Sequence, residues 1–263
     1  MQPKPVSVRV RLIVLAAAAG AVLAGCGGGS ETSAPEAPPH PAGREAAPAC
    51  VAGDERPLGD ERVALMGLAR RPLTAVSGPE GRAVASFGLR NENGHPTVLG
   101  VLGEVVDARC RPTWYRVQLP IKPNGATGYV RAGDLALHSV ETRLVVDLSE
   151  RRVTLFRRGE PVLRTSAAVG APGTPTPTGR FFVDQRIVAA DPTGPWGPGA
   201  IGISAFSPVL ADWAQEGPIA IHGTDAPDSI GRAASNGCVR VRNAVLEELF
   251  AATQAGSPVL IRA

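Results

Sequence analysis

One histidine and one cysteine near the end of the chain have the side chains needed for acyl transfer through a thiol. His222 is followed by Gly223 and Thr224, and Cys238 lies 16 positions (238 − 222) after the histidine, directly behind Gly237. A thiol near its normal pKa is mostly protonated at neutral pH, so a nucleophilic cysteine needs a base or a positive neighbour. The pair therefore indicates a thiol nucleophile with its imidazole base, the alternative being a buried structural cysteine.

Two short strands are predicted to carry this pair, one from Pro218 to His222 and one from Cys238 to Arg242. Side chains in a strand alternate between two faces, so Cys238 shares a face with Arg240. If the strands are neighbours, imidazole, thiol and guanidinium meet. Arg240 is then a candidate to favour the thiolate or to bind a substrate carboxylate through its planar fork, and a structural ion pair is the alternative.

The residues just before the cysteine are predicted to shape its backbone. Gly237 has no Cβ, so it permits conformations closed to larger residues and lets a carbonyl group approach closely. The backbone N–H groups of Gly237 and Cys238 are therefore candidates for an oxyanion hole. Ser235 is expected either to hydrogen-bond the substrate or to brace this loop. Asp225 is a weak candidate for an acidic partner of the imidazole.

These motifs resemble the signature of the YkuD-type L,D-transpeptidases. The resemblance rests on His-Gly-Thr at 222–224, followed by Ser-Asn-Gly-Cys-Val-Arg at 235–240. It extends to the Thr-Pro-rich segment Thr174 to Phe181 and to the strand Gly202 to Phe206, and it covers roughly residues 142–261. Asn236 stands where many members have a second histidine, which leaves Cys238 and His222 in place.

The resemblance implies a mainly β catalytic domain with a β-sandwich-like fold and one or two helices. It implies that Cys238 attacks a tetrapeptide donor stem of peptidoglycan, releases D-alanine and holds the stem as a thioester, which an amine of a second stem resolves into a 3-3 crosslink. It also implies that the Gly223 carbonyl fixes the imidazole tautomer and that carbapenem-type β-lactams acylate the same sulfur. The predicted substrate-binding residues are Thr224, Ser235, Asn236 and Arg240.

Two other functions are alternatives, and the first of them uses the same residues. An L,D-carboxypeptidase would use water as the acceptor, and a catalytically silent wall-binding lipoprotein would use none of this chemistry. We expect no cofactor and no metal. A zinc site needs more ligands than one histidine and one cysteine, and His40, His95 and His138 show no ligand spacing.

The N-terminus predicts export and lipidation. Lys4, Arg9 and Arg11 precede an apolar run that is short for a membrane span, as in a secretory signal. The sequence Leu-Ala-Gly-Cys at 23–26 resembles a lipobox, with an ordinary signal peptide as the alternative. We therefore expect a lipoprotein signal peptide at 1–25, a lipid on Cys26, and a Pro/Ala/Gly tether at 26–49. The protein is then extracytoplasmic, anchored to a bacterial membrane and facing the cell wall or periplasm.

The remaining cysteines and the net charge fit an exported protein. With Cys26 and Cys238 assigned, Cys50 and Cys110 are left as a disulfide pair in an oxidising compartment. The formal charge of +3 comes from 27 basic and 24 acidic residues. Residues 1–25 hold three basic groups and no acidic one. The rest of the chain therefore has 24 basic (27 − 3) and 24 acidic residues, so its net charge is zero. We therefore expect no nucleic-acid partner.

Two domains are expected after the tether. Residues 50–139 contain short alternating apolar runs, among them Val98 to Val106, which predict a small all-β barrel. Its segment from Trp114 to Val130 resembles the closing strands of a bacterial SH3-like domain, in which Trp114 and Tyr129 are either core residues or a ligand platform. Residues 140–263 form the expected catalytic domain, opened by a hairpin of residues 144–147 and 153–156. A helix is predicted from Asn243 as N-cap. The resemblance implies that the loop at 188–200 with Trp196 is a lid over the substrate groove, the alternative being a plain surface loop.

Overall fold

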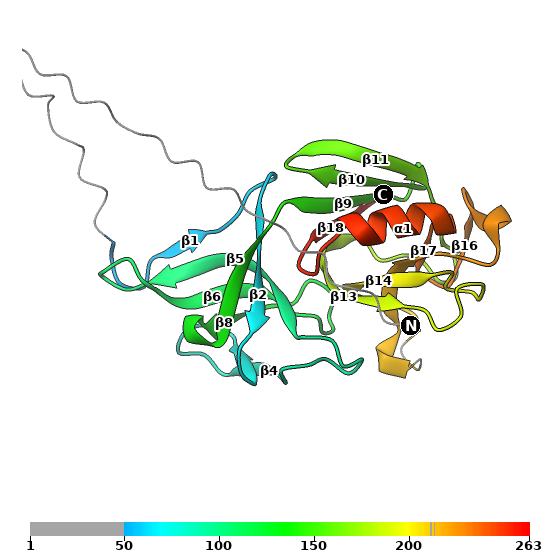
Figure 1. The fold of residues 1–263 in the computed structure, drawn as a ribbon. Helices are drawn as coiled ribbons and strands as arrows, with labels where there is room; N and C mark the ends of the chain where they lie inside the picture. The colour runs from blue at the N-terminus through cyan, green and yellow to red at the C-terminus, as the bar shows by residue number, and fades with distance from the viewer. Residues whose placement is uncertain (1–49, 211, 213) are drawn as a thin grey trace, which may run out of the picture. The chain divides into compact units, whose positions relative to one another are not determined.

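The computed structural model describes residues 50–210, 212 and 214–263, and these form a mainly β protein (Figure 1). The predicted signal peptide, the lipidation site Cys26 and the tether lie outside the described residues. Within the described part, the strands build two eight-stranded sheets and one two-stranded sheet, with one α-helix and three short 3-10 turns. None of these helices has the length and apolarity needed to cross a membrane.

The first sheet is built by the strands between residues 55 and 140. Its order is β4-β3-β7-β6-β5-β2-β8, and β1 pairs with β5. The 3-10 turn η1 (Ala132–Asp134) leads into the last strand. The strands are β1 (Glu55–Pro57), β2 (Ala64–Ala69), β3 (Leu73–Val76), β4 (Ala83–Phe87), β5 (Val98–Val106), β6 (Pro112–Gln118), β7 (Thr127–Arg131) and β8 (Leu135–Val140).

One face of the first sheet buries its own apolar cluster, which includes Leu99, Tyr115 and Val130. Trp114 and Tyr129 lie outside that cluster, because each neighbours a core residue along its strand and so points to the opposite face. The Arg131 guanidinium lies 4.5 Å from the Trp114 ring centre, and the Tyr129 hydroxyl donates to Glu55 Oε2 at 2.7 Å. The core alternative for these two aromatic residues is therefore wrong.

The disulfide between Cys50 and Cys110 is confirmed. Their Cα atoms are 5.3 Å apart, and the bridge joins the start of the described chain to the turn between β5 and β6. That turn is also closed by the Cys110 N–H, which donates to the Asp107 carbonyl. The bridge therefore holds the segment before β1 against the strand that β1 pairs with.

The second sheet follows from residue 142, in the order β11-β10-β9-β18-β13-β14-β15-β17. The predicted hairpin is confirmed as antiparallel β9 and β10. A small parallel sheet of β12 and β16 lies beside it. The strands are β9 (Thr142–Asp147), β10 (Arg152–Arg157), β11 (Glu160–Ser166), β12 (Val169–Gly170), β13 (Gly179–Val188), β14 (Gly199–Phe206), β15 (Pro218–His222), β16 (Ala233–Ser235), β17 (Val239–Arg240) and β18 (Pro258–Arg262).

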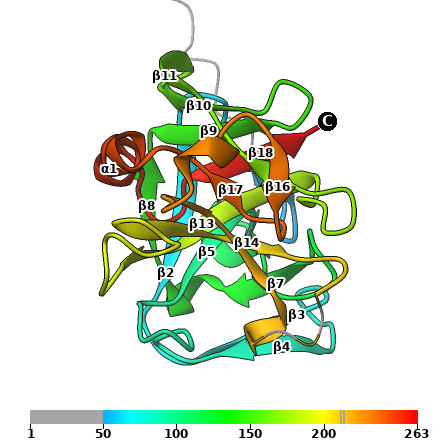
Figure 2. The ribbon, with the colours of Figure 1, turned by 90° about the vertical axis from the view of Figure 1, so that its right-hand side faces the viewer.

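The second sheet is curled, because the chain that leaves its edge strand β11 bonds at once to the strand at the opposite edge, β17. Strand β11 forms one edge and ends at Ser166, yet Ala168 exchanges two backbone hydrogen bonds of 2.9 Å with Arg240 at the opposite edge. Figures 1 and 2 both show β16 and β17 next to each other at that edge. The result is the β-sandwich-like arrangement that was expected, with the core enclosed between its layers.

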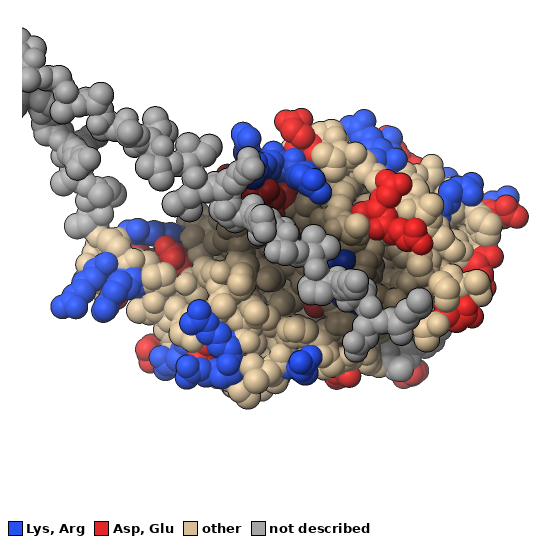
Figure 3. Space-filling view, viewed as in Figure 1, with Lys and Arg blue, Asp and Glu red and all other residues tan. Residues whose placement is uncertain are grey.

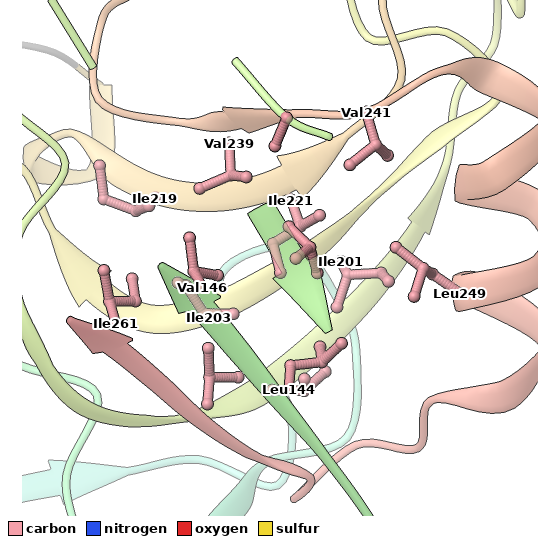
Figure 4. Packing of buried hydrophobic residues seen from close by; sticks show 14 of the residues in the cluster. Leu144, Val146, Ile201, Ile203, Ile219, Ile221, Val239, Val241, Leu249 and Ile261 are labelled. Carbon is pink, nitrogen blue, oxygen red and sulfur yellow. The ribbon is translucent and has the colours of Figure 1, made fainter. Parts of the chain in front are cut away.

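That core consists of the inward-facing residues of nearly every strand in the second sheet, shown in Figure 4. Ile201, Ile221 and Val239 come from β14, β15 and β17, and each is fully buried. The helix α1 (Asn243–Ala252) adds Leu249 from one side. Since the alternate residues of β15 and β17 point away from this core, the packing of Ile221 and Val239 fixes which side His222 and Cys238 face.

Helix α1 lies where it was predicted, but its first residue plays a different part. The N-cap is Arg242, which forms no side-chain cap, and Asn243 is the first helical residue. The Asn243 side chain accepts a hydrogen bond of 2.7 Å from the Thr224 N–H. The predicted N-cap role of Asn243 is therefore wrong, because its amide is used to hold a different loop.

Polar side chains of the first sheet bind the backbone and side chains of the second. Asn124 forms two hydrogen bonds of 2.8 Å with the N–H and carbonyl of Phe206. Gln118 donates to the Arg180 carbonyl, and Asn91 donates to Gln185.

On the face shown in Figure 3, basic and acidic side chains are interspersed and no broad field of one sign appears.

Candidate active site

Parallel pairing of β15 and β17 brings the predicted residues together. His222 pairs with Arg240 and Ile221 with Val239, so the preceding residues, Ala220 and Cys238, are also side by side. This confirms that the two predicted strands are neighbours, although β17 is shorter than the predicted strand. Because paired residues point the same way, His222, Cys238 and Arg240 share the face opposite the core.

His222 is held as a neutral imidazole with one defined tautomer. Its side chain is only 5% exposed, and its Nδ1 lies 2.5 Å from the Gly223 carbonyl oxygen. A carbonyl can only accept, so Nδ1 carries the proton and Nε2 is left with a free lone pair. Burial lowers the pKa of His222 to about 4, and the Arg240 charge adds to this effect. The imidazole is thus ready to accept a proton at neutral pH.

Cys238 is the free cysteine of the described residues and is partly exposed. Burial raises the pKa of the Cys238 thiol, while a hydrogen bond from the Ala220 backbone and the Arg240 charge act in the opposite direction. The sulfur lies 4.0 Å from the Pro218 carbonyl oxygen. A raised thiol pKa and a lowered imidazole pKa mean that both groups rest uncharged.

Arg240 has no carboxylate partner among the residues that the structure describes, so the structural ion pair is wrong for this residue. Its Nε is buried and has no hydrogen-bond partner. The guanidinium lowers the pKa of both His222 and Cys238 by its charge. Its position therefore suits either stabilisation of a thiolate or binding of a substrate carboxylate.

Ser235 braces the loop before the nucleophile. Its hydroxyl donates to the Cys238 carbonyl at 2.5 Å and accepts from the Gly237 N–H at 3.1 Å. Gly237 has a φ of 112°, which side chains rarely adopt, so the glycine is required here. The Gly237 N–H, one of the two predicted oxyanion-hole donors, thus already has an acceptor in Ser235. The Cys238 N–H has no acceptor among the described residues and remains the candidate.

The other predicted contact residues differ in how far they reach the surface. Thr224 is buried, and its hydroxyl oxygen accepts a hydrogen bond of 3.0 Å from the Ala226 N–H. Its side chain therefore holds the turn after the histidine. Asn236 and Asp225 are exposed. Asp225 forms no hydrogen bond to the imidazole, whose Nδ1 is occupied by Gly223.

Asn243, which the sequence suggested only as a helix N-cap, fixes the loop that orients His222. A Cβ on Gly223 would overlap Asn243 Oδ1 and lie 2.9 Å from Pro198 Cδ and 3.0 Å from Gly197 Cα. Close packing of Gly197, Gly223 and Asn243 therefore positions the carbonyl that binds the imidazole. The only sequence signal for this role was a polar residue at the start of the helix.

Trp196 covers the imidazole from the loop between β13 and β14. Its ring centre lies 4.6 Å from that of His222, with the planes tilted by 41°, and the side chain is still 45% exposed. The loop is folded on itself, because Gly197 N–H donates to Gly194 and Thr193 bonds twice to Asp191. Trp196 thus shields one side of the imidazole from water.

No three His, Cys, Asp or Glu side chains within residues 50–210, 212 and 214–263 are arranged to hold a metal ion.

Comparison with known proteins identifies the class of this chain. Residues 141–261 match the model of the YkuD family, the L,D-transpeptidase catalytic domain. The chain is 32% identical over 123 residues to YkuD of Bacillus licheniformis, which covers 47% of this chain and 67% of the relative. It is 30% identical over 124 residues to YkuD of Bacillus subtilis, covering 47% and 68%. Both relatives are named as candidate L,D-transpeptidases. The chain belongs to the YkuD family of L,D-transpeptidases, which are acyltransferases.

Solved structures give a weaker likeness. An L,D-transpeptidase from Mycobacterium smegmatis is 15% identical with a TM-score of 0.42, covering 76% of this chain and 99% of that one. Bd1075 of Bdellovibrio bacteriovorus is 28% identical with a TM-score of 0.37, covering 46% of this chain and 47% of that one. This chain therefore spans about half the length of Bd1075. At these TM-scores the likeness carries no further argument.

Proposed function

We propose that this protein is a peptidoglycan L,D-transpeptidase that forms 3-3 crosslinks through a thioester on Cys238. The observation that carries the proposal is the shared sheet face of His222, Cys238 and Arg240, with His222 Nδ1 bound to the Gly223 carbonyl. That geometry leaves Nε2 as the base for the thiol beside it. The donor class in this proposal, a stem peptide ending in D-alanine, is what the resemblance to the family implies.

The acylation step needs a single proton relay. The Cys238 thiol gives its proton to His222 Nε2 as the sulfur attacks the carbonyl after the third, diamino-acid residue of the donor. The oxyanion of the tetrahedral intermediate accepts a hydrogen bond from the Cys238 N–H. When the peptide bond breaks, the imidazolium returns its proton to the leaving D-alanine amine, and the stem stays on sulfur as a thioester.

The second step repeats the relay with a new nucleophile. An amine of a neighbouring stem attacks the thioester carbonyl and gives a proton to His222. The carbon–sulfur bond breaks, the amide of the crosslink remains, and the thiolate recovers its proton from the imidazolium. The Arg240 charge stabilises the sulfur anion in both steps. Trp196, whose ring packs at a tilt against His222, keeps water from competing with the amine.

β-Lactam acylation of the same sulfur belongs to this proposal. L,D-transpeptidase 3 from Mycobacterium tuberculosis has been solved with a faropenem-derived adduct. We expect carbapenem-type compounds to add their acyl group to Cys238.

The placement in the cell rests on the sequence. A lipid on Cys26 and a tether at 26–49 would hold the enzyme at a bacterial membrane while it reaches the cell wall. The first sheet, as an SH3-like domain, would orient the catalytic domain on its substrate. The two hydrogen bonds between Asn124 and the Phe206 backbone support such a fixed orientation.

The test is product analysis of the full-length protein in detergent with a disaccharide-tetrapeptide substrate. Crosslinked dimers that form with loss of D-alanine, and that are absent with Cys238→Ala, are the expected result. Tripeptide without dimers would instead identify an L,D-carboxypeptidase. Unchanged substrate would favour a silent wall-binding protein. Labelling of Cys26 by lipid, read by mass spectrometry of the N-terminal peptide, tests the anchor separately.

A further inference from the structure

The segment between β12 and β13 folds back over the loop that carries the nucleophile. Strand β12 pairs in parallel with β16, so Gly170 lies beside Ser235. The chain then turns sharply, because the Thr174 N–H donates to the Ala171 carbonyl at 2.9 Å. A Cβ on Gly170 would overlap the Thr174 carbonyl oxygen, so this close approach of two backbone segments needs glycine. The small sheet thus brings Thr174 to the start of the nucleophile's loop.

Two donors of this segment hold one carbonyl group of that loop. The Ser235 carbonyl oxygen accepts a hydrogen bond of 2.9 Å from the Thr174 hydroxyl and another of 2.9 Å from the Ala171 N–H. Ser235 is buried and Thr174 is half-buried. Two donors that converge on one acceptor fix the direction of the carbonyl, and with it the plane of the peptide between Ser235 and Asn236.

That peptide begins the turn that ends at the thiol. The Ser235 hydroxyl binds both the Gly237 N–H and the Cys238 carbonyl, so it closes the turn from inside. The Pro175 carbonyl oxygen lies 3.6 Å from the point where a Cβ of Gly237 would be. The segment that holds the Ser235 carbonyl therefore also covers the turn at its glycine.

The turn sets the direction of the Cys238 N–H more than the position of the Cys238 sulfur. The peptide between Gly237 and Cys238 belongs to the turn, and its N–H is the candidate oxyanion donor. The residue after the thiol, Val239, is already locked in the sheet, where it pairs with Ile221 and is fully buried. A looser hold on Ser235 should therefore rotate the N–H while the sulfur stays in place.

We propose that Thr174 is a positioning residue for acylation, and that it aims the Cys238 N–H at the developing oxyanion through the Ser235 carbonyl. The inference rests on the acylation step of the proposed function, because the oxyanion arises only when the thiol attacks an acyl group. An oxyanion donor is effective only if it is already aimed before the reaction starts. The Thr174 hydroxyl supplies this aim from outside the nucleophile's own loop.

Removing the hydroxyl tests this role. Thr174→Val keeps the shape of the side chain, and the Ser235 carbonyl keeps the Ala171 N–H, so no buried acceptor is left unpaired. We expect acylation of the full-length protein in detergent by imipenem, a carbapenem, to slow roughly 10- to 100-fold, because the oxyanion donor is turned away rather than lost. Intact-protein mass spectrometry follows the adduct. An acylation rate equal to that of wild type would overturn the proposal.

Alkylation of the same sulfur distinguishes positioning from general damage to the site. Iodoacetamide forms a carbon–sulfur bond with loss of iodide and passes through no oxyanion, so its rate reports the thiol and its base alone. We expect Thr174→Val to be alkylated within about twofold of wild type, with a melting temperature lower by about 1 to 6 °C for one lost hydrogen bond. If alkylation slows as much as acylation, Thr174 has only a structural role and the proposal is wrong.

Two further variants assign the effect to the hydroxyl. Thr174→Ser restores the donor on a smaller side chain and should be acylated within about threefold of wild type. The matched control Thr178→Val removes an exposed hydroxyl from the same segment and should leave both rates within about twofold. A Thr174→Ser protein as slow as Thr174→Val would show that the hydroxyl is not the acting group, which would also refute the proposal.

Reaction with the stem peptide separates this inference from the proposed function. If wild type reacts with imipenem but leaves the disaccharide-tetrapeptide unchanged, the transpeptidase proposal fails while the comparison of Thr174→Val with wild type still decides the positioning role. If wild type and Thr174→Val form crosslinked dimers at equal rates, the transpeptidase proposal stands and the positioning role fails. A wild-type protein that forms no adduct with either reagent would refute both.

Discussion

Replacing Gly223 with alanine tests whether packing behind the histidine sets the rate of acylation. Gly223 needs no unusual backbone conformation, because it is absent from the glycines with positive φ. The added methyl group would, however, overlap Asn243 Oδ1 and lie within 3.0 Å of Pro198 Cδ and of Gly197 Cα. A proline ring and backbone atoms cannot move aside as a flexible side chain can. The loop carrying the imidazole's partner must shift instead.

The expected cost follows from these contacts. Overpacking of this kind destabilises a protein by about 1 to 3 kcal/mol. For a chain of this size each kcal/mol lowers the melting temperature by about 2 to 4 °C, so the expected drop is about 2 to 12 °C. The effect on rate should be larger, because the Gly223 carbonyl fixes His222 Nδ1 at 2.5 Å. A displacement of about 1 Å at a catalytic base costs about 100-fold.

The assay measures the rate at which a tetrapeptide donor acylates Cys238, by intact-protein mass spectrometry, together with thermal melting. Gly173→Ala is the matched control, since a Cβ there meets no atom within 4 Å. The double variant with Asn243→Ala removes the overlapping oxygen, so its loss of stability should be smaller than the sum of the single losses. If Gly223→Ala melts and acylates like Gly173→Ala, the packing argument is refuted.

Four further results are expected. Because the pKa of His222 is lowered to about 4, the acylation rate should fall as the pH drops through about 4, and a fall centred near 6.5 would contradict the buried neutral imidazole. Because the pKa of Asp184 is raised from 3.8 to about 7, the protonated carboxyl group favours the folded state; this contribution to stability is complete below pH 3.8 and lost as the pH rises through 7. Asp184→Asn should therefore raise the melting temperature more at pH 8 than at pH 5. Arg240→Met should shift the pH profile of Cys238 alkylation upward, since the positive charge lowers that thiol's pKa, and an unmoved profile would remove Arg240 from the site's electrostatics. Reducing the disulfide of the first sheet, which closes a 60-residue separation, should lower stability by roughly 4 kcal/mol in the chain-entropy model while the acylation rate stays unchanged.

Much of the candidate site could be predicted from the sequence because it depends on local pattern. Strand alternation placed His222 on the face of Ala220 and Cys238 on the face of Arg240, and the structure pairs those strands directly. The helix after the motif follows from its apolar stripe, and it lies at Asn243–Ala252. The disulfide followed from the number of cysteines in an exported chain. These features need only the order of the residues and the geometry of a strand or helix.

The partners of polar groups could not be predicted, because they depend on which distant segments meet. The sequence could not show that the Gly237 N–H is taken by Ser235, or that Asn243 binds Thr224 rather than capping its own helix. A hydrogen bond forms with whichever acceptor the fold brings within about 3 Å, and strand alternation does not rank such acceptors.

What the sequence by itself determined is the chemistry: a thiol, an imidazole and a guanidinium on strands of known alternation. What only the tertiary structure decided is their environment, which gives the chemistry its direction. Trp196, from the loop between β13 and β14, covers His222, and burial lowers that residue's pKa; Asp184 lines a cavity walled by both sheets, and burial raises its pKa. Desolvation depends on every atom packed around a group, so it is set by segments far from that group in the chain.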